Sequence, residues 1–582
     1  MNNEKRLPSV EKPWQKYLPK ENLGIEVPNK SIYEYVRDNA QRVMDSTAIE
    51  YFGTKISYRS FLERIDRFAD SLKAIGVKEG EYVSFLAVTF PETITALYAL
   101  NKIGAIANFI DPRIDVEGIK QLILDAKSKV LFVLDFAYPK IKPILEDLNL
   151  EYLITVTPNQ SLPGILKFAR SLKKLDKDVP YGEKVLKCID FENLPVKEKA
   201  ETIEFKANRV AALVYTGGTT GFPKGVMLSN ENFNAVSMGF GYGGLDVEDG
   251  DSFLDVMPIF ASYGLVFGVH MPLTLRMKLI VVPKFDAAKF AKQVKKYRPT
   301  FMVGVPAFYE KLISSRVVKN LDMSFLKMAA SGGDTMSKPL EEKINKFFED
   351  HKVKYKIAQG YGMSEVSSAA SFCFNNAFKS LSVGIPTITS TFGVFKPEST
   401  EELGYNEEGE ICMTGPQVML GYLNKPEESK KVMIKHPDGR IWIHSGDIGR
   451  IDEDGFVYIQ SRIKHMVIRF DGHKVFPVQI ESEIMKHSAV TACAVIGVKD
   501  SAHMQGEVPL AIVELKEEDG GKEVNKETVY RQLCKYCNKN LEERGKPAEI
   551  IFIDRMPYTS MGKQDKLGLK EKYKDLEITY KI

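Results

Sequence analysis

The feature that most constrains the fold is a regular alternation of strand-like and helix-like segments between residues 56 and 150. Apolar residues at helical spacing predict helices over 60–75, 92–104 and 116–126, and short apolar runs predict strands over 82–88, 105–109 and 130–134. Alternation of this kind is typical of a doubly wound, largely parallel sheet. The same alternation resumes further on, with strands over 279–282 and 301–305 and a helix over 338–349.

The order of the predicted helices and strands changes near residue 462. Beyond Phe476 we expect a helix (478–486), two strands (490–498 and 508–515), a helix (526–540) and a strand (549–553). This is an α+β unit of roughly a hundred residues, and the polar run 461–465 before it is the candidate hinge. The predicted fold is therefore α/β, with a large N-terminal domain of doubly wound mixed sheets (1–462) and a small mobile α+β domain (463–582).

Composition excludes several classes of protein. A chain of 582 residues is too long for one compact domain. Its formal net charge is +3, with 80 basic and 77 acidic side chains, and so nothing indicates a nucleic-acid partner. The N-terminal stretch lacks the apolar core of a signal peptide, and no apolar run approaches the ~20 residues of a membrane span. Six cysteines in so long a chain fit a reducing compartment, and we expect a cytoplasmic protein.

One basic segment is of separate interest. Between residues 162 and 175, apolar side chains recur at helical spacing with lysines and an arginine between them. Such a helix either packs on its own domain or rests on an anionic membrane surface. A single short helix without a second anchor binds membranes weakly, so packing is the favoured interpretation, with weak membrane-surface contact as the alternative.

The stretch YTGGTTGFPKG (215–225) combines three threonines, four glycines and one lysine. Glycine-rich loops with a single lysine suggest phosphate binding, because backbone N–H groups converge on an anion. The P-loop pattern fails, since Lys224 is followed by Gly225 instead of serine or threonine. Strands are predicted on both sides of the loop, followed by a helix capped by Ser229 or Asn230. A glycine-rich loop between two strands is suited to binding the triphosphate of a nucleotide. The alternative interpretation of this stretch is an ordinary glycine-rich turn.

With this loop, four further stretches resemble the motifs of the adenylate-forming superfamily, which includes acyl-CoA synthetases, adenylation domains of peptide synthetases and beetle luciferases. They are QGYGMSE (359–365), GEICMTGPQVMLGYLNKPE (409–427), IHSGDIGRIDEDGFVYIQSR (443–462) and PYTSMGKQDK (557–566). Five motifs in this order are specific, whereas any one alone is a weak signal. The resemblance covers nearly the whole chain.

The resemblance implies an AMP-forming acid–thiol ligase that uses ATP, magnesium and coenzyme A. A carboxylate attacks the α-phosphorus of ATP to give an acyl-adenylate and pyrophosphate, and the CoA thiol then takes the acyl group and releases AMP. The first step places negative charge on phosphorus and pyrophosphate, so cations and hydrogen-bond donors have to be in place. The implied catalytic residues are Lys563, Glu365 and Ser364, with Glu365 as the magnesium ligand.

The same resemblance assigns the nucleotide site. Tyr361 is expected to stack on adenine, Asp447 to accept the ribose hydroxyls and Arg462 to donate to the same sugar. The implied ATP-binding residues are Thr216, Gly217, Gly218, Thr219, Thr220, Gly221, Lys224, Gly333, Asp334, Tyr361, Asp447 and Arg462. The implied hinge is Lys464, and the face presented to the thiol after rotation of the small domain carries Gly472, His473 and Lys474.

The acyl pocket is the least determined part of the site. Matching by position, the implied walls are Phe260, Ala261, Val303, Gly304, Gly332 and Met363. These residues are apolar or small, and each buried methylene contributes ~0.8 kcal/mol, which favours a medium- to long-chain fatty acid. An aromatic or sterol-like acid is the alternative.

Three departures from the family pattern bear on this site. Gly217 stands where relatives often have serine, Ala261 stands where a histidine or aromatic residue often gates the pocket, and the segment 462–472 is one residue longer than usual. The last of these affects the thiol step more than adenylation.

Two other functions are compatible with these residues. The adenylate could pass to a separate carrier protein, or the chain could be a nucleotide-binding regulator without catalysis. The presence of Lys563, Glu365, Asp447 and Arg462 counts against the regulator, and nothing in the sequence singles out luciferase-like oxidation. The oligomeric state is not indicated.

Overall fold

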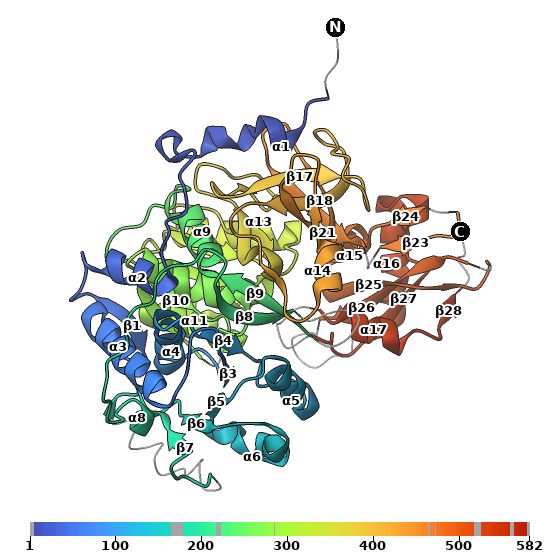
Figure 1. Cartoon of the computed structure of the whole chain (residues 1–582). Coiled ribbons are helices and arrows are strands. Elements are labelled where there is room, and N and C mark those ends of the chain that lie inside the picture. Colours follow the sequence, from blue (N-terminus) through green and yellow to red (C-terminus); the bar gives the residue numbers. More distant parts are fainter. Residues whose placement is uncertain are drawn as a thin grey trace.

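The computed structural model describes residues 5–164, 179–216, 223–283, 286–463, 466–471, 473–503, 505–516, 525–558 and 564–578. Figure 1 shows a large N-terminal domain of interleaved sheets and helices beside a smaller C-terminal domain, in red. The predicted fold class, mixed α/β with a second small α+β domain, is confirmed. In the part of the chain described here, no helix is long and apolar enough to cross a membrane.

The first sheet of the large domain has nine strands in the order β16-β15-β14-β13-β12-β10-β11-β1-β2. Its inner strands run parallel, and antiparallel strands close both edges. The strands are β1 (Thr47–Tyr51), β2 (Thr54–Ser57), β10 (Ser252–Asp255), β11 (Lys278–Val281), β12 (Phe301–Gly304), β13 (Met328–Ser331), β14 (Ala358–Met363), β15 (Ser368–Phe372) and β16 (Ile385–Pro386).

The second sheet has eight strands in the order β19-β9-β8-β4-β3-β5-β6-β7. Six of them run parallel, while β9 and β19 run antiparallel at one edge. The strands are β3 (Tyr82–Leu86), β4 (Ile106–Phe109), β5 (Val130–Leu134), β6 (Tyr152–Val156), β7 (Val185–Lys187), β8 (Val210–Thr216), β9 (Lys224–Ser229) and β19 (Gly421–Tyr422). The glycine-rich loop therefore joins two paired strands, β8 and β9, as predicted.

Some helices of the large domain begin at residue types that cap helices well. Ser57 accepts the Ser60 N–H at the start of α3, and Ser229 and Asn232 form a reciprocal capping box at the start of α9. The helices are α1 (Pro8–Glu11), α2 (Ile32–Ala40), α3 (Tyr58–Ala74), α4 (Pro91–Lys102), α5 (Val116–Asp125), α6 (Tyr138–Ile141), α8 (Cys188–Phe191), α9 (Asn230–Gly241), α10 (Met271–Thr274), α11 (Phe290–Tyr297), α12 (Pro306–Ile313), α13 (Lys338–Asp350) and α14 (Pro426–Val432). Shorter turns include the 3₁₀ segments η1 (Pro13–Tyr17) and η8 (Ser364–Val366) and the π-helix η5 (Tyr263–His270).

A third, antiparallel sheet lies toward the C-terminal domain. It has the order β17-β18-β21-β20, with β22 paired to β21. The strands are β17 (Thr391–Phe395), β18 (Gly409–Thr414), β20 (Met433–Lys435), β21 (Ile441–Ile451) and β22 (Val457–Arg462). Two of the sequence motifs, 409–427 and 443–462, supply most of this sheet.

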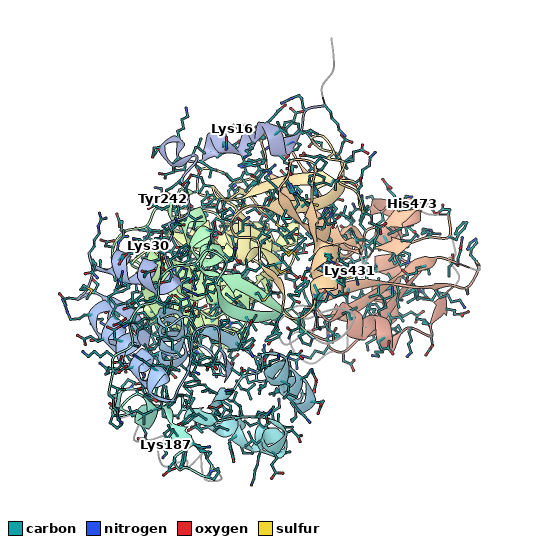
Figure 2. The ribbon with its side chains drawn as sticks, viewed as in Figure 1. Lys16, Lys30, Lys187, Tyr242, Lys431 and His473 are labelled. Carbon is teal, nitrogen blue, oxygen red and sulfur yellow. The ribbon has the colours of Figure 1, made fainter. Side chains whose placement is uncertain are left out.

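The N-terminal segment crosses this third sheet. Figure 1 shows α1 above β17, and Figure 2 shows Lys16 on the same segment, where its ammonium pairs with Asp454 at 2.5 Å. Trp14 is buried against Gly455, whose φ is +90°. A Cβ at Gly455 would lie 2.7 Å from the Trp14 backbone nitrogen, so glycine is needed here for both reasons.

The C-terminal domain has its own small sheet, β27-β26-β25-β28, and a hairpin, β23-β24. Apolar residues form one cluster around Val495 and Leu533 and another around Ile512 and Met556. The elements are β23 (Val467–Ile468), β24 (Lys474–Val475), β25 (Val490–Asp500), β26 (Glu507–Leu515), β27 (Glu549–Ile553), β28 (Glu577–Ile578), α15 (Pro477–Ile484), α16 (Lys526–Asn540) and α17 (Lys566–Lys572).

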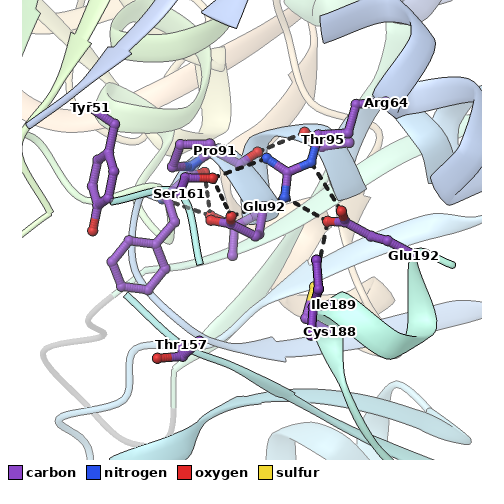
Figure 3. A network of polar contacts seen from close by, with 12 residues as sticks. Tyr51, Arg64, Pro91, Glu92, Thr95, Thr157, Ser161, Cys188, Ile189 and Glu192 are labelled. Atoms are coloured by element: carbon purple, nitrogen blue, oxygen red, sulfur yellow. Dashed lines mark hydrogen bonds and ion pairs between the residues drawn. The ribbon is translucent and has the colours of Figure 1, made fainter. Parts of the chain in front are cut away.

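A buried polar network joins α3, α4 and the segment around α8 (Figure 3). The Arg64 guanidinium lies 2.9 Å from the Glu92 carboxylate and 2.7 Å from that of Glu192. The Ser161 hydroxyl donates to Glu92, and Arg64 also donates to Ser161 at 3.2 Å. The network attaches both flanks of the 165–178 segment to the helices. That segment itself, and with it most of the predicted basic helix, lies outside the described residues, so its membrane contact stays a prediction.

Candidate active site

Tyr361, Asp447 and Arg462, from two different motifs, lie together. The Tyr361 hydroxyl, on β14, donates to Asp447 Oδ2 at 2.6 Å, and Arg462 Nε donates to Asp447 Oδ1 at 3.0 Å. Strand pairing explains the second contact, because Asp447 on β21 is the direct register partner of Arg462 on β22. The Asp447 carboxylate is buried, so both oxygens are held in place.

The electrostatics of this trio follow from burial and charge. The carboxylate of Asp447 raises the pKa of Arg462 against the opposing effect of burial. Burial, together with the same carboxylate, raises the pKa of the Tyr361 hydroxyl well above its usual value. At neutral pH the tyrosine is therefore a neutral donor and the arginine a cation.

Glu365 is the buried carboxylate of the site. It lies in η8, directly after β14, and its Oε1 accepts the Tyr422 hydroxyl at 2.7 Å. Burial raises the pKa of Glu365, while the Tyr422 hydrogen bond and the charges of Arg462 and Lys224 lower it. The neighbouring Ser364 hydroxyl lies 3.2 Å from that of Ser262.

Lys224 lies near Tyr422, the hydrogen-bond partner of Glu365. It begins β9, opposite Thr216 at the end of β8. Its ammonium pairs with Glu428 on α14 at 2.6 Å and lies 5.0 Å from the centre of the Tyr422 ring. The loop residues between these strand ends, Gly217, Gly218, Thr219, Thr220 and Gly221, lie outside the described residues.

A cavity of 130 Å³ opens beside Tyr361. Of the six expected acyl-pocket residues, Gly332 and Met363 line this cavity, while Phe260, Ala261, Val303 and Gly304 do not contribute to its lining. Val303 is fully buried in the core, and the Gly304 carbonyl accepts the Tyr263 hydroxyl at 3.3 Å. The lining residues are Met257, Tyr263, Phe267, Val305, Ala330, Ser331, Gly332, Gly333, Gly360, Tyr361, Gly362, Met363, Ser368, Ala369 and Phe372.

Gly333 and Asp334 follow β13, and Gly333 also lines the cavity. Gly333 has φ of +80°, and Asp334 Oδ1 accepts the Thr335 N–H at 2.8 Å. This turn therefore lies at the cavity beside Tyr361, and the resemblance assigns both of its residues to the ATP site.

Three predicted positions lie outside the described residues: the catalytic lysine Lys563, the hinge Lys464 and Gly472 of the thiol face. His473 and Lys474 are described in the hairpin β23-β24, where the Arg469 N–H donates to the His473 carbonyl at 2.9 Å. Figure 2 shows His473 on the C-terminal domain and Lys431, of α14, near the boundary between the two domains.

Comparisons with known proteins identify the family of the chain. The model of the AMP-binding enzyme family matches residues 36–423, and that of the AMP-binding enzyme C-terminal domain matches residues 479–563. The first match spans well over half of the chain, and the chain belongs to the AMP-binding enzyme family.

Individual relatives are consistent with that assignment. The chain is 29% identical to a long-chain-fatty-acid–CoA ligase of Bacillus subtilis (strain 168), over 95% of this chain and 96% of the relative. It is 28% identical to the 4-coumarate–CoA ligase CCL1 of Humulus lupulus, over 93% of each chain. The crystal structure of ATP-bound MatB from Rhodopseudomonas palustris superposes with a TM-score of 0.80 at 26% identity, over 95% of this chain and 99% of that one. The expected class of enzyme, an AMP-forming acid–thiol ligase, is confirmed.

Proposed function

We propose that this chain activates an apolar carboxylic acid with ATP and transfers the acyl group to coenzyme A. The observation that carries the proposal is the convergence of Tyr361 and Glu365, from one motif, with Asp447 and Arg462, from another, beside an apolar cavity. A nucleotide held by the first three residues would place its phosphates toward Glu365 and Lys224, and the acid would enter the cavity.

Each described residue has a definite part in the first step. Asp447 accepts hydrogen bonds from the ribose hydroxyls, and Arg462, kept cationic by Asp447, donates to the same sugar. Tyr361 presents its ring to adenine across from Gly333 and Asp334. Lys224 and the hydroxyl groups of Thr216 and Ser364 stabilise the phosphate charge that grows as pyrophosphate leaves.

The donor set at Glu365 fits magnesium. A buried carboxylate oxygen is the ligand type that this hard cation prefers, and the positive charges of Arg462 and Lys224 oppose the rise in the pKa of Glu365 that burial causes. Bound magnesium would supply charge neutralisation of the phosphates. Tyr422 orients that carboxylate, because its hydroxyl donates a hydrogen bond to Glu365 Oε1.

The proposed domain division is 1–462 and 463–582, with Lys464 as the hinge. In one orientation Lys563 would serve adenylation, and in the other Gly472, His473 and Lys474 would face the thiol. Separate apolar clusters in the two domains support this division. Lys563→Ala should abolish adenylation but spare thioester formation from preformed adenylate, and equal loss of both steps would contradict the rotation.

The proposed substrate is a medium- to long-chain fatty acid. The apolar lining and the fatty-acid ligase among the relatives support it. Apolar cavities of roughly 150 Å³ accept one benzene ring, so a long chain requires this smaller cavity to enlarge, for example by rotation of Phe267 or Phe372. An aromatic acid is the competing substrate, in line with the 4-coumarate ligases among the relatives.

The deciding experiment measures AMP formation from ATP and magnesium with acetate, octanoate, palmitate, benzoate and cinnamate, with and without CoA. CoA-dependent AMP release with octanoate or palmitate would support the proposal. Release with the aromatic acids alone would replace the substrate class. Acid-dependent pyrophosphate exchange without stimulation by CoA would indicate a carrier protein as acceptor. Asp447→Asn is the matched control, because it keeps the shape of the side chain and removes its charge.

A further inference from the structure

A row of buried polar side chains runs through the third sheet toward Asp447. His436 Nε2 and His444 Nε2 lie 2.9 Å apart, and His444 Nδ1 lies 2.8 Å from Glu410 Oε2. All three side chains are buried, and the His436 ring stacks on Trp442. None of these residues was assigned a role from the sequence, although Glu410 and His444 lie within the motifs 409–427 and 443–462 and His436 lies between them.

The second carboxylate oxygen of Glu410 accepts a hydrogen bond from the backbone of the site. Oε1 accepts the Gly446 N–H at 2.8 Å, and Gly446 immediately precedes Asp447. Gly446 has φ of +71°, so the strand turns sharply at this residue. The Glu410 carboxylate therefore holds the backbone at the bend that immediately precedes Asp447.

The protons of the row can be assigned from its partners. Burial, assisted by His444, lowers the pKa of His436 to about 4, so His436 is neutral at physiological pH. Both contacts are satisfied when His436 Nε2–H donates to His444 Nε2 and His444 Nδ1–H donates to Glu410 Oε2. The two histidines thus hold Glu410 in one orientation.

The alternative interpretation of this cluster is a metal-ion site. Glu410, Cys412 and His444 offer ligand atoms within 4.8 Å of one another. The nitrogen atoms of His444 and both oxygens of Glu410 are already engaged in the hydrogen bonds above, however, whereas Cys412 makes only a weak contact with the Glu410 carbonyl. The row therefore accounts for the geometry without an ion, and Cys412 is a neighbour that does not belong to it.

We propose that Glu410 is a positioning residue for the nucleotide site, oriented by His444 and His436, and that it sets recognition of the ribose through Asp447. This proposal rests on the function proposed above, in which Asp447 binds the ribose hydroxyls. It adds that ribose recognition depends on a buried carboxylate that does not itself touch the nucleotide.

The test compares ATP with 2′-deoxy-ATP as substrates for AMP formation. A hydrogen bond to a charged group contributes about 1.5–3 kcal/mol, so wild type should prefer ATP by about tenfold or more in kcat/KM. Glu410→Met, which has similar length but no acceptor, should lose most of that preference through a raised KM for ATP. Glu410→Gln keeps an acceptor for Gly446, and its amide N–H can donate to His444 Nδ1 once the two histidines exchange tautomers, so it should retain the preference. Cys412→Ser, in the same buried cluster, is the matched control and should behave as wild type.

The outcomes separate the two proposals. A folded Glu410→Met protein with the full wild-type preference overturns the positioning role, as does equal loss in Cys412→Ser. If Glu410→Met does not fold, His436→Phe provides the test, because it keeps the ring against Trp442 and removes the donor to His444; an unchanged preference then overturns the proposal. A wild-type protein that forms no AMP with any acid refutes the proposed function itself.

Discussion

Removing the charge of Arg64 gives the most quantitative test of the structure. Arg64 is one cation between two buried carboxylates, Glu92 and Glu192 (Figure 3). Burial disfavours its charge, but the carboxylates outweigh that effect and raise its pKa. The perturbation is Arg64→Met, which keeps the apolar stem of the side chain and removes the guanidinium.

The expected loss can be obtained in two ways. Arg64 donates four hydrogen bonds to Glu92, Glu192 and Ser161, and each net hydrogen bond contributes about 1 kcal/mol. Removing one partner of a buried ion pair costs about 3–5 kcal/mol. Both routes predict that the free energy of unfolding falls by about 4 kcal/mol, a large part of the stability of an ordinary domain.

Urea unfolding followed by tryptophan fluorescence is a suitable assay. The chain has two tryptophans, Trp14 and Trp442, and both are buried in the large domain, so the signal reports that domain. Arg59→Ala is the matched control on the same helix. Its partner is Asp45 and its side chain is 51% exposed, so at most about 1 kcal/mol should be lost.

Two further measurements sharpen this prediction. Combining Arg64→Met with Glu92→Gln and Glu192→Gln should recover most of the loss, because no buried charge is left unpaired. Burial already raises the pKa of Glu192 although Arg64 opposes it, and without Arg64 this pKa should rise further. The native variant then holds protons that the unfolded chain releases, so its deficit should grow between pH 5 and pH 8. A loss below about 1 kcal/mol, or one independent of pH, would refute the reasoning.

Three other substitutions have definite expectations. Burial raises the pKa of Asp255 from 3.8 to about 8, so the stability of wild type should decline as pH rises through that window, and Asp255→Asn should remove this slope in urea titrations at pH 5.5 and 8. Tyr422→Phe deletes the hydrogen bond to Glu365, and the magnesium concentration for half-maximal AMP formation should rise several-fold; an unchanged requirement would argue against Glu365 as ligand. Gly332→Ala places a methyl group 3.3 Å from the Gly360 carbonyl, and it should reduce kcat/KM for the bulkiest accepted acid more than for acetate.

Periodicity predicted most regular elements well. The helix expected over 526–540 is α16, and the strand expected over 130–134 is β5, both with the predicted bounds. These segments have one apolar period and clear boundaries, such as Asn525 capping α16. Local pattern and tertiary packing demand the same structure there, and so the sequence alone is sufficient.

The candidate active site was harder to predict from the sequence than the helices and strands were. Phe267 lines the cavity from the π-helix η5, a segment that is apolar throughout and therefore gives no period from which its inward face can be read. Ser445, Gly446 and Asp447 have the composition of a turn, yet they lie within β21. The carboxylate of Glu410 holds that segment from the neighbouring strand, a contact between residues far apart in the chain.

The separate apolar clusters of the C-terminal domain have a consequence for how the molecule tolerates damage. Within the described residues, no buried apolar cluster is shared between the two domains. Large-scale reorientation therefore need not expose the interior of either domain to water. By the same logic, Arg64→Met should lower the stability of the large domain and leave that of the C-terminal domain unchanged, so that urea unfolds the two domains in separable transitions.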